Sequence, residues 1–450
     1  MNRPSFHLTA PRNWINDPNG FIWYRGQYHL FYQHFPYANR WGTMHWGHAV
    51  SPDLAHWTQR DIALFPTVKG DKNGCFSGSA LEKDGAMRLY YTGVNYGSTP
   101  DDDIHVANGS DFVSCQLQLT SPDGETFDNF GGKTVAVPVL DDPQFGGAAH
   151  TRDPKVWEED GVYYMLLGSQ YQNGHGACQP QLLVYASGDG SSWSFLGHTR
   201  KPGFGWMFEC PDYYELDGRG LVTLSPMGLS DGLTSQGELT YCGDCAFDPR
   251  TGAMDFEVED LRLLDCGKDL YAAQTNLDEA GRRTQVAWLR MPRPLDGEDW
   301  FGLIALPRVV SRRDGAPCFD VHPNVRACFT REIPLARADT EAPLRLTAEL
   351  GEGAGVEVGG YTVTLKNGEL LADRGAVFPH DAPQYELVSA APAGAGRHFA
   401  EIYVDCGVVE TFLDGGAQTI THGVYGLTGG VRPMGSAELH CFEMDGGNLK

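Results

Sequence analysis

A β-hairpin closed by a turn glycine recurs five times within residues 21–288. Each copy has an aromatic or aliphatic strand, a short turn containing glycine, and a second strand of the same kind. The turn glycines are residues 26, 85, 161, 218 and 281, which lie 59, 76, 57 and 63 residues apart. These spacings allow a four-stranded sheet per repeat, and almost no helical periodicity separates the copies. The repeat favours an all-β fold with a five-bladed β-propeller, and a β-sandwich or solenoid is the alternative.

The pattern changes after Arg312. Residues 313–341 are irregular and punctuated by proline, which is typical of a linker laid over a surface. From about residue 342 the chain has short segments in which apolar and polar residues alternate, with glycine-rich turns between them. This pattern indicates an antiparallel β-sandwich. We therefore expect a catalytic propeller domain over residues 1–312, a linker over 313–341 and a sandwich domain over 342–450.

The net charge of −24 excludes some classes of partner. Such an acidic chain is not expected to bind nucleic acid or an anionic membrane surface, whereas a neutral small molecule suits it. The N-terminus lacks the apolar core of a signal peptide, and no apolar run approaches the ~20 residues that span a bilayer. These features predict a cytoplasmic protein, and they leave a homo-oligomer open.

The cysteines predict neither a disulfide framework nor a metal centre. Eleven are scattered along the chain, and their only Cys-x-x-Cys is Cys242-Gly-Asp-Cys245, with no second pair at zinc-ligand spacing. Buried free thiols are the simpler interpretation. We expect no metal and no other cofactor.

Three carboxylates occupy equivalent places in three of the repeats. Asp17 stands nine residues before the first turn glycine, Asp153 eight before the third, and Glu209 nine before the fourth. Pro18 pushes Asp17 toward an extended conformation. In a propeller, equivalent positions of different blades lie at the same depth around the axis, so the three acids should converge at one end of the channel.

Converging acids suit glycoside hydrolysis, in which one carboxylate attacks and another donates a proton. Asp17 is short and rigidly placed, as a nucleophile should be. Glu209 follows the apolar residues 206–208, a setting that raises a carboxyl pKa as a general acid requires. Asp153, beside Arg152, is expected to stay ionised and to stabilise an oxocarbenium-like charge. Each acid alone could equally form a structural ion pair or cap.

Other residues near these acids are of kinds that bind sugars. The two remaining repeats place Phe76-Ser77 and Tyr271-Ala272-Ala273 at the same depth, and Asn16, Gln33 and Trp41 lie close to the first acid. An aromatic face and hydroxyl or amide groups are what a furanose ring requires. Each could singly be part of the core.

Together these motifs resemble the β-fructosidases of glycoside hydrolase family 32, which include invertases, fructan hydrolases and sucrose-6-phosphate hydrolases. The similar motifs, in family order, are His7-x-x-x-Pro11, Asn16-Asp17-Pro18-Asn19-Gly20, Phe31-Tyr32-Gln33, Trp46-Gly47-His48, Phe76-Ser77-Gly78-Ser79, Arg152-Asp153-Pro154, Glu209-Cys210-Pro211, Leu306-Pro307-Arg308 and Val409-Glu410-Thr411-Phe412. The resemblance covers nearly the whole chain. It implies a five-bladed propeller followed by a β-sandwich.

The resemblance also implies roles for individual residues. Asp17 would be the nucleophile, Glu209 the acid/base and Asp153 the transition-state stabiliser, with retention of anomeric configuration through a fructosyl-enzyme. The residues implied to line the fructose subsite are Asn16, Gln33, Trp41, Phe76, Ser77, Arg152 and Tyr271. Ala273 and Ala287 depart from the family pattern, which puts substrate preference in doubt rather than the reaction.

Several substrates fit this sequence. Hydrolysis of terminal non-reducing β-D-fructofuranosides, with sucrose first, is the leading hypothesis. Sucrose-6-phosphate is the runner-up and would need cations near the leaving sugar, for which Arg40, Arg200 and Lys201 are candidates. Exo-hydrolysis of fructans and transfer of fructose are further alternatives. A non-catalytic sugar-binding propeller is a remote one, because a lectin has no use for three converging acids.

Overall fold

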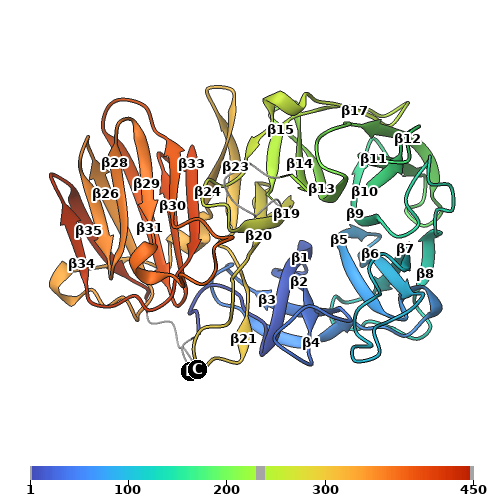
Figure 1. The fold of residues 1–450 in the computed structure, drawn as a ribbon, viewed down its shortest axis with the longest axis horizontal. Helices are drawn as coiled ribbons and strands as arrows, with labels where there is room; N and C mark the ends of the chain where they lie inside the picture. Colours follow the sequence, from blue (N-terminus) through green and yellow to red (C-terminus); the bar gives the residue numbers. More distant parts are fainter. Residues whose placement is uncertain (1–2, 230–238, 446–450) are drawn as a thin grey trace.

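The computed structural model describes residues 3–229 and 239–445, which form a ring of β-sheets beside a two-layered β-sandwich (Figure 1). Strands dominate both parts. The helical elements among the described residues are short: η1 (Lys69–Asp71), η2 (Val258–Asp260), α1 (Pro323–Arg326), η3 (Leu335–Arg337) and η4 (Gly375–Val377).

Five successive sheets make up the ring. The first contains β1 (Asn13–Tyr24), β2 (Gln27–Phe35), β3 (His45–Ser51), β4 (Thr58–Leu64) and β21 (Trp300–Phe301). The second contains β5 (Gly74–Lys83), β6 (Ala86–Tyr96), β7 (Phe112–Ser121) and β8 (Thr134–Val137). The third contains β9 (Thr151–Glu159), β10 (Val162–Gln172), β11 (Cys178–Ser187) and β12 (Ser194–Arg200).

The remaining sheets complete the ring toward the sandwich. The fourth contains β13 (Met207–Leu216), β14 (Arg219–Met227), β15 (Tyr241–Asp244) and β18 (Arg262–Leu263). The fifth contains β19 (Leu270–Leu277), β20 (Arg283–Leu289), β22 (Leu303–Ile304), β23 (Arg308–Arg313) and β24 (Ala316–Val321). A separate ribbon pairs β16 (Ala246–Asp248) with β17 (Ala253–Asp255).

All five predicted hairpins form, and each contributes the strands that begin one sheet of the ring. The turn glycines have φ angles between 74° and 82°, which glycine adopts without the steric penalty of a Cβ. The first strands of the hairpins, β1, β5, β9, β13 and β19, contact one another around the axis. We call these the inner strands.

Every inner strand has an irregular register at the same level. The paired positions skip between residues 15 and 18 in β1, 75 and 78 in β5, 152 and 155 in β9, 209 and 212 in β13, and 271 and 274 in β19. Such a bulge frees backbone groups from the ladder and redirects the side chains beside it. Asp153, Cys210 and Ala272, at three of these bulges, have φ angles of 64°, 44° and 56°.

The sandwich consists of two antiparallel sheets. The first contains β25 (Arg331–Ile333), β26 (Leu344–Leu350), β31 (His398–Asp405), β32 (Val408–Leu413), β33 (Gln418–Gly423) and β35 (Glu438–Glu443). The second contains β27 (Gly355–Val358), β28 (Tyr361–Lys366), β29 (Glu369–Asp373), β30 (Val388–Pro392) and β34 (Val431–Met434). In β28 buried residues alternate with partly exposed ones, as the period-two pattern predicts.

The predicted all-β fold, a propeller followed by a sandwich, is confirmed. The expected linker over 313–341 differs from the structure, because β24 pairs with β23 in the fifth sheet and β25 pairs with β35 in the sandwich. The prolines of this segment indicated irregular structure, but they do not prevent strands from forming there. Pro317 lies in β24, which is the edge strand of its sheet, where a missing N–H is tolerated.

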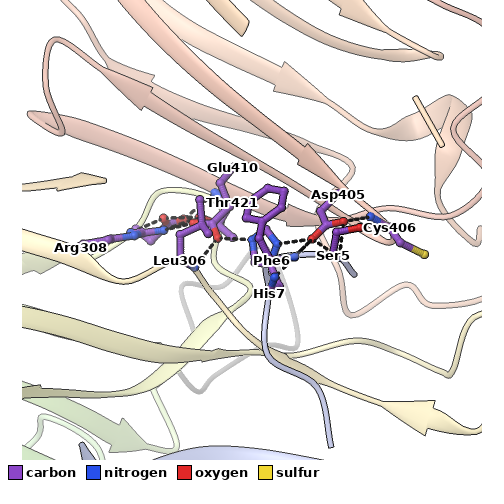
Figure 2. A network of polar contacts seen from close by, with 10 residues as sticks. Ser5, Phe6, His7, Leu306, Arg308, Asp405, Cys406, Glu410 and Thr421 are labelled. Atoms are coloured by element: carbon purple, nitrogen blue, oxygen red, sulfur yellow. Dashed lines mark hydrogen bonds and ion pairs between the residues drawn. The ribbon is translucent and has the colours of Figure 1, made fainter. Parts of the chain in front are cut away.

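A buried group of charged residues joins the propeller to the sandwich (Figure 2). We call it the interdomain network, and it consists of His7, Asp265, Arg308, Asp405 and Glu410. Arg308 contacts Asp265 at 2.9 Å and Glu410 at 2.8 Å, and His7 contacts Asp405 at 3.0 Å and Glu410 at 2.9 Å. All five side chains are at most 2% exposed.

The interdomain network also holds the backbone that leads into β1. The amides of Ser5, Phe6 and His7 donate hydrogen bonds to the Asp405 carboxylate (Figure 2). Burial lowers the pKa of His7, but its two carboxylate partners outweigh burial and raise that pKa to about 9. The imidazole is therefore a cation at neutral pH, donating from both ring nitrogens.

Within the described ranges, no helix is long and apolar enough to cross a membrane. All eleven cysteines are free. Six of them, including both members of the Cys242–Cys245 pair, are buried as expected, whereas Cys178, Cys210, Cys266, Cys328 and Cys406 are partly exposed.

Candidate active site

A cavity of about 410 Å³ lies at the end of the ring where the inner strands bulge. Its lining includes all ten residues that the sequence analysis proposed: Asn16, Asp17, Gln33, Trp41, Phe76, Ser77, Arg152, Asp153, Glu209 and Tyr271. These ten residues are spread over more than half of the length of the chain. Eight of them lie at the bulges of the five inner strands, which are at one level, whereas Gln33 comes from β2 and Trp41 from the loop that follows β2.

Asp17 is held by three neutral donors. The Ser77 hydroxyl lies 2.6 Å from its Oδ2, the Asn16 amide 3.1 Å from its Oδ1, and the Cys210 thiol 3.5 Å from its Oδ2. Burial, and then the negative charge of Glu209, raise the pKa of Asp17, while these donors oppose the rise. Neutral donors thus fix the direction of the carboxylate, and no cation among the described residues is paired with it.

Asp153 lies close to the same thiol. Its Oδ2 accepts a hydrogen bond of 2.9 Å from the backbone N–H of Cys210 and lies 3.6 Å from the Cys210 sulfur. Burial raises the pKa of Asp153 to about 7, with Glu209 and Asp17 adding to the rise and Arg152 opposing it. Arg152 Nε lies 3.9 Å from Asp153 Oδ2, but the guanidinium donates its shorter hydrogen bond to another acid, so Arg152 opposes the rise in the pKa of Asp153 without cancelling it.

That acid is Glu209. Arg152 Nη2 donates to Glu209 Oε1 at 2.6 Å, and the Tyr271 hydroxyl donates to Oε2 at 2.6 Å. The sequence predicted an apolar setting for Glu209, and Met207 and Phe208 are indeed fully buried. The hydrogen-bond partners of the Glu209 carboxylate are instead the polar groups of Arg152 and Tyr271. The Glu209 side chain is 19% exposed, so it reaches the cavity while a cation and a phenol orient it.

The remaining predicted residues, Gln33, Trp41 and Phe76, also line the cavity. Trp41 and Phe76 make an edge-to-face pair with ring centroids 5.6 Å apart, and Trp41 is 37% exposed. Gln33 is buried, and its amide donates to the backbone carbonyl of Cys75 at 3.0 Å. Aromatic faces beside oriented amides and hydroxyls match a ring that carries several hydroxyl groups.

Sequence reasoning missed nine lining residues: Trp14, Tyr96, Val106, Ala107, Gly109, Phe112, His150, Met227 and Trp288. Proximity to a motif could have suggested Trp14, His150 and Trp288. Trp14 packs against Trp288, with centroids 5.7 Å apart. The residues between β6 and β7 carry no local signal and reach the cavity only through the course of that loop. Ala273 and Ala287, which depart from the family pattern, are buried and do not line the cavity.

The family of the chain follows from a sequence profile. The profile of the "Glycosyl hydrolases family 32 N-terminal domain" matches residues 7–318. The chain belongs to glycosyl hydrolase family 32. The raffinose invertase of Escherichia coli is 37% identical to this family 32 chain over 326 residues, which are 70% of the chain and 63% of that relative. The chain therefore spans less than two thirds of that relative's length.

Solved structures of two other proteins have the same fold. The sucrose-6-phosphate hydrolase of Lactobacillus gasseri superimposes with a TM-score of 0.83 at 22% identity, over 99% of this chain and 93% of that one. A variant of the family 32 β-fructofuranosidase of Bombyx mori in complex with sucrose gives 0.79 at 25% identity, over 98% and 94%. Together with the sheets described above, these matches place the propeller and the sandwich in one arrangement shared by the family.

Proposed function

We propose that this chain is a retaining β-fructofuranosidase that removes terminal non-reducing β-D-fructofuranosyl residues, with sucrose as its substrate. The observation that carries the proposal is the convergence of Asp17, Asp153 and Glu209 on one cavity lined with aromatic and amide side chains. Two positioned carboxyl groups are what glycoside hydrolysis requires. The sucrose complex of the Bombyx mori family member supports the choice of substrate.

Asp17 is the proposed nucleophile. In the first step a carboxylate oxygen of Asp17 attacks the anomeric carbon of the fructosyl ring, and the bond to the bridging oxygen breaks. Glu209, in its protonated form, gives its proton to that oxygen, so glucose leaves as a neutral alcohol. The three donors around Asp17 fix the direction of attack, while Arg152 and Tyr271 hold Glu209 in place.

The second step regenerates the enzyme. Glu209, now a carboxylate, takes a proton from a water molecule whose oxygen attacks the anomeric carbon, and the bond to Asp17 breaks. Two displacements at the same carbon retain its configuration. Asp153, when ionised, faces the positive charge that develops on the ring in both transition states and is the proposed stabiliser.

The charges of the cavity favour sucrose over sucrose-6-phosphate. Among the described lining residues of the cavity Arg152 is the single arginine or lysine, and it already forms an ion pair with Glu209. Burial, and then the charge of Arg152, lower the pKa of His150 to about 4, so its imidazole is neutral at pH 7. Among the described lining residues a phosphate dianion would find three carboxyl groups and no uncommitted cation.

The cations that the sequence suggested for a phosphate lie elsewhere. Arg40 pairs with Asp103 at 2.9 Å, and Arg200 donates to the Gln181 side chain at 3.1 Å. Lys201 donates to the backbone carbonyl of Phe256. None of these three cations lines the cavity.

Fructose release from sucrose, sucrose-6-phosphate and inulin at equal concentration tests the proposal, with Asp17→Asn as the inactive control. We expect kcat/KM for sucrose to exceed that for the phosphate ester at least tenfold. A preference for the phosphate ester would overturn the choice of substrate and leave the reaction standing. Release from none of the three by folded protein would overturn the activity itself.

A further inference from the structure

A group of possible metal ligands lies outside the candidate active site. Asp53 and His56 are in the turn between β3 and β4 of the first sheet, and Cys328 follows α1 in the segment that leads to the sandwich. A carboxylate oxygen, an imidazole nitrogen and the thiol sulfur of these residues lie within 4.8 Å of one another. We call them the Asp–His–Cys cluster. More than 270 residues separate Cys328 from His56, so no local spacing in the sequence indicates the cluster.

The turn that contains Asp53 occurs three times in the ring, and the copies show what the turn itself requires. In each copy the Oδ1 atom of an aspartate accepts hydrogen bonds of 2.7–3.0 Å from the backbone N–H groups two and three residues later. The three aspartates are Asp53, Asp123 and Asp189. Forming the turn therefore uses Oδ1 and does not require Oδ2.

The side chain three residues after the aspartate differs between the copies. In the second copy it is a threonine, and the Thr126 hydroxyl donates to Asp123 Oδ2 at 2.8 Å. In the first copy it is a histidine, and His56 Nδ1 lies 2.7 Å from Asp53 Oδ2. The side chains of Asp53 and His56 are 32% and 36% exposed, and Cys328 is partly exposed, so the cluster lies at the surface of the molecule.

A second group of similar composition, Asp278, Glu279 and His322, is already neutralised by the protein. Arg282 pairs with Asp278 at 2.5 Å and with Glu279 at 3.8 Å. Both ring nitrogens of His322 also have partners, Asp278 at 2.9 Å and the backbone N–H of Asn324 at 3.2 Å. In the Asp–His–Cys cluster, by contrast, the carboxylate forms no ion pair with an arginine or lysine among the described residues. Its charge is available to a cation.

We propose that the Asp–His–Cys cluster binds one zinc ion through Asp53 Oδ2, His56 Nδ1 and Cys328 Sγ. Zinc accepts oxygen, nitrogen and sulfur ligands together, and a water molecule fills the fourth position where the protein supplies three ligands. Around a tetrahedral ion with bonds of about 2.0–2.3 Å, neighbouring ligand atoms stand about 3.3–3.5 Å apart. The oxygen and nitrogen, at 2.7 Å, need to separate slightly, and the sulfur is close enough to complete the site by a small side-chain movement.

Binding replaces existing hydrogen bonds with bonds to the ion. The sulfur binds as a thiolate, so the thiol proton passes to solvent. The imidazole binds in its neutral form through Nδ1 and carries its proton on Nε2. The ion then ties the first sheet of the propeller to the segment that precedes β25. This proposal does not depend on the proposed glycosidase activity.

Calorimetric titration with zinc chloride at pH 7, after dialysis against EDTA and then against buffer alone, tests the site. Cys328→Ser removes the sulfur, and His56→Thr replaces the imidazole with a hydroxyl of the kind that Thr126 supplies in the second copy of the turn. Cys178→Ser removes another partly exposed cysteine, and Asp17→Asn removes a carboxylate of the candidate active site. Titration with cobalt chloride adds a specific readout, because a cobalt–thiolate bond absorbs in the near ultraviolet.

We expect one saturable zinc site per chain in the unsubstituted protein, in Cys178→Ser and in Asp17→Asn. Zinc affinity should fall at least tenfold in Cys328→Ser and in His56→Thr, which also serves as the test if Cys328→Ser does not fold. The cobalt–thiolate absorption should be lost in Cys328→Ser and kept in Cys178→Ser.

Three results would overturn the proposal. The first is the absence of saturable zinc binding to the unsubstituted protein. The second is equal affinity in the unsubstituted protein, Cys328→Ser and His56→Thr, which would mean that zinc binds elsewhere on the surface. The third is loss of binding in Asp17→Asn alone, which would place the ion in the candidate active site.

Discussion

The interdomain network and the candidate active site both gather three carboxyl groups in a buried place, but they pair them differently. In the network each carboxylate meets Arg308 or His7 as well as neutral donors. In the active site one cation, Arg152, contacts Glu209. Within the part of the chain that the structure describes, Asp17 has neutral donors alone, and Asp153 has a cation no nearer than 3.9 Å.

This difference separates groups that stabilise the fold from groups that are available for chemistry. Paired carboxylates stay ionised and fixed, as the lowered pKa of Glu410 beside His7 and Arg308 illustrates, although burial acts the other way. Burial raises the pKa values of Asp17 and Asp153, that of Asp153 to about 7, so Asp153 can hold and release a proton near neutral pH. Removing a carboxylate should therefore have opposite consequences in the two places.

Substituting Asp17 should have the largest effect on activity. We expect Asp17→Asn to lower kcat by at least about 10³-fold, because the attacking oxygen is lost. Stability should stay equal or rise, because a desolvated carboxylate without a cation is removed. Fructose release and urea unfolding measure the two quantities. A variant that keeps near-normal turnover would show that Asp17 is not the nucleophile.

Substituting Glu209 should have a large effect that depends on the leaving group. Glu209→Gln should lower kcat/KM for sucrose by about 10²–10⁴-fold, since proton donation is lost. An aryl fructofuranoside with an acidic phenol as leaving group needs little protonation, so its first step should be much less affected. Rates of Glu209→Gln on the two substrates check this assignment. Asp17→Asn is the control, because it should lose activity on both substrates. Equal losses on both substrates would contradict it.

Substituting Glu410 should lower the stability of the protein and leave its activity nearly unchanged. Glu410→Gln leaves His7 and Arg308 without their shared carboxylate, and breaking a buried pair in this way costs about 3–5 kcal/mol. We expect the free energy of unfolding to fall by that amount while kcat of the folded fraction changes less than about twofold. Urea unfolding and assays below the transition measure both. Unchanged stability would remove the distinction drawn here.

Raising the pH should weaken the network by a smaller amount. The pKa of His7 is raised from 6.5 to about 9 in the folded chain, so its stabilisation is complete below pH 6.5 and is lost as the pH rises through 9. We expect the free energy of unfolding to fall by about 2–3 kcal/mol between pH 6.5 and 10 from this group. His7→Gln should flatten that part of the profile. A profile identical in both proteins would exclude His7 as its source.

Much of this molecule could be read from local sequence patterns. The five turn glycines predicted the hairpins, because a turn of this shape requires positive φ whatever surrounds it. Counting back from those glycines placed Asp17, Asp153 and Glu209 at one level, and the inner strands put all three in one cavity. The strand over residues 316–321 was missed, because whether Pro317 is tolerated depends on the strand being an edge.

The partners of the charged residues were beyond the reach of sequence. The motifs around His7, Arg308 and Glu410 look as distinctive as those around the three acids, yet they form the contact between propeller and sandwich. Arg152 lies next to Asp153 in sequence but pairs with Glu209, 57 residues away.

The sequence by itself determined the hairpins, the repeat and the level of each acid, because these follow from backbone conformation and strand periodicity within a few residues. The tertiary structure alone decided which charge faces which. Long side chains such as those of arginine and glutamate reach across strands from different sheets, and burial then sets the pKa values of the groups that meet. For that reason the chemistry of Asp17, Asp153 and Glu209 depends on the closed ring.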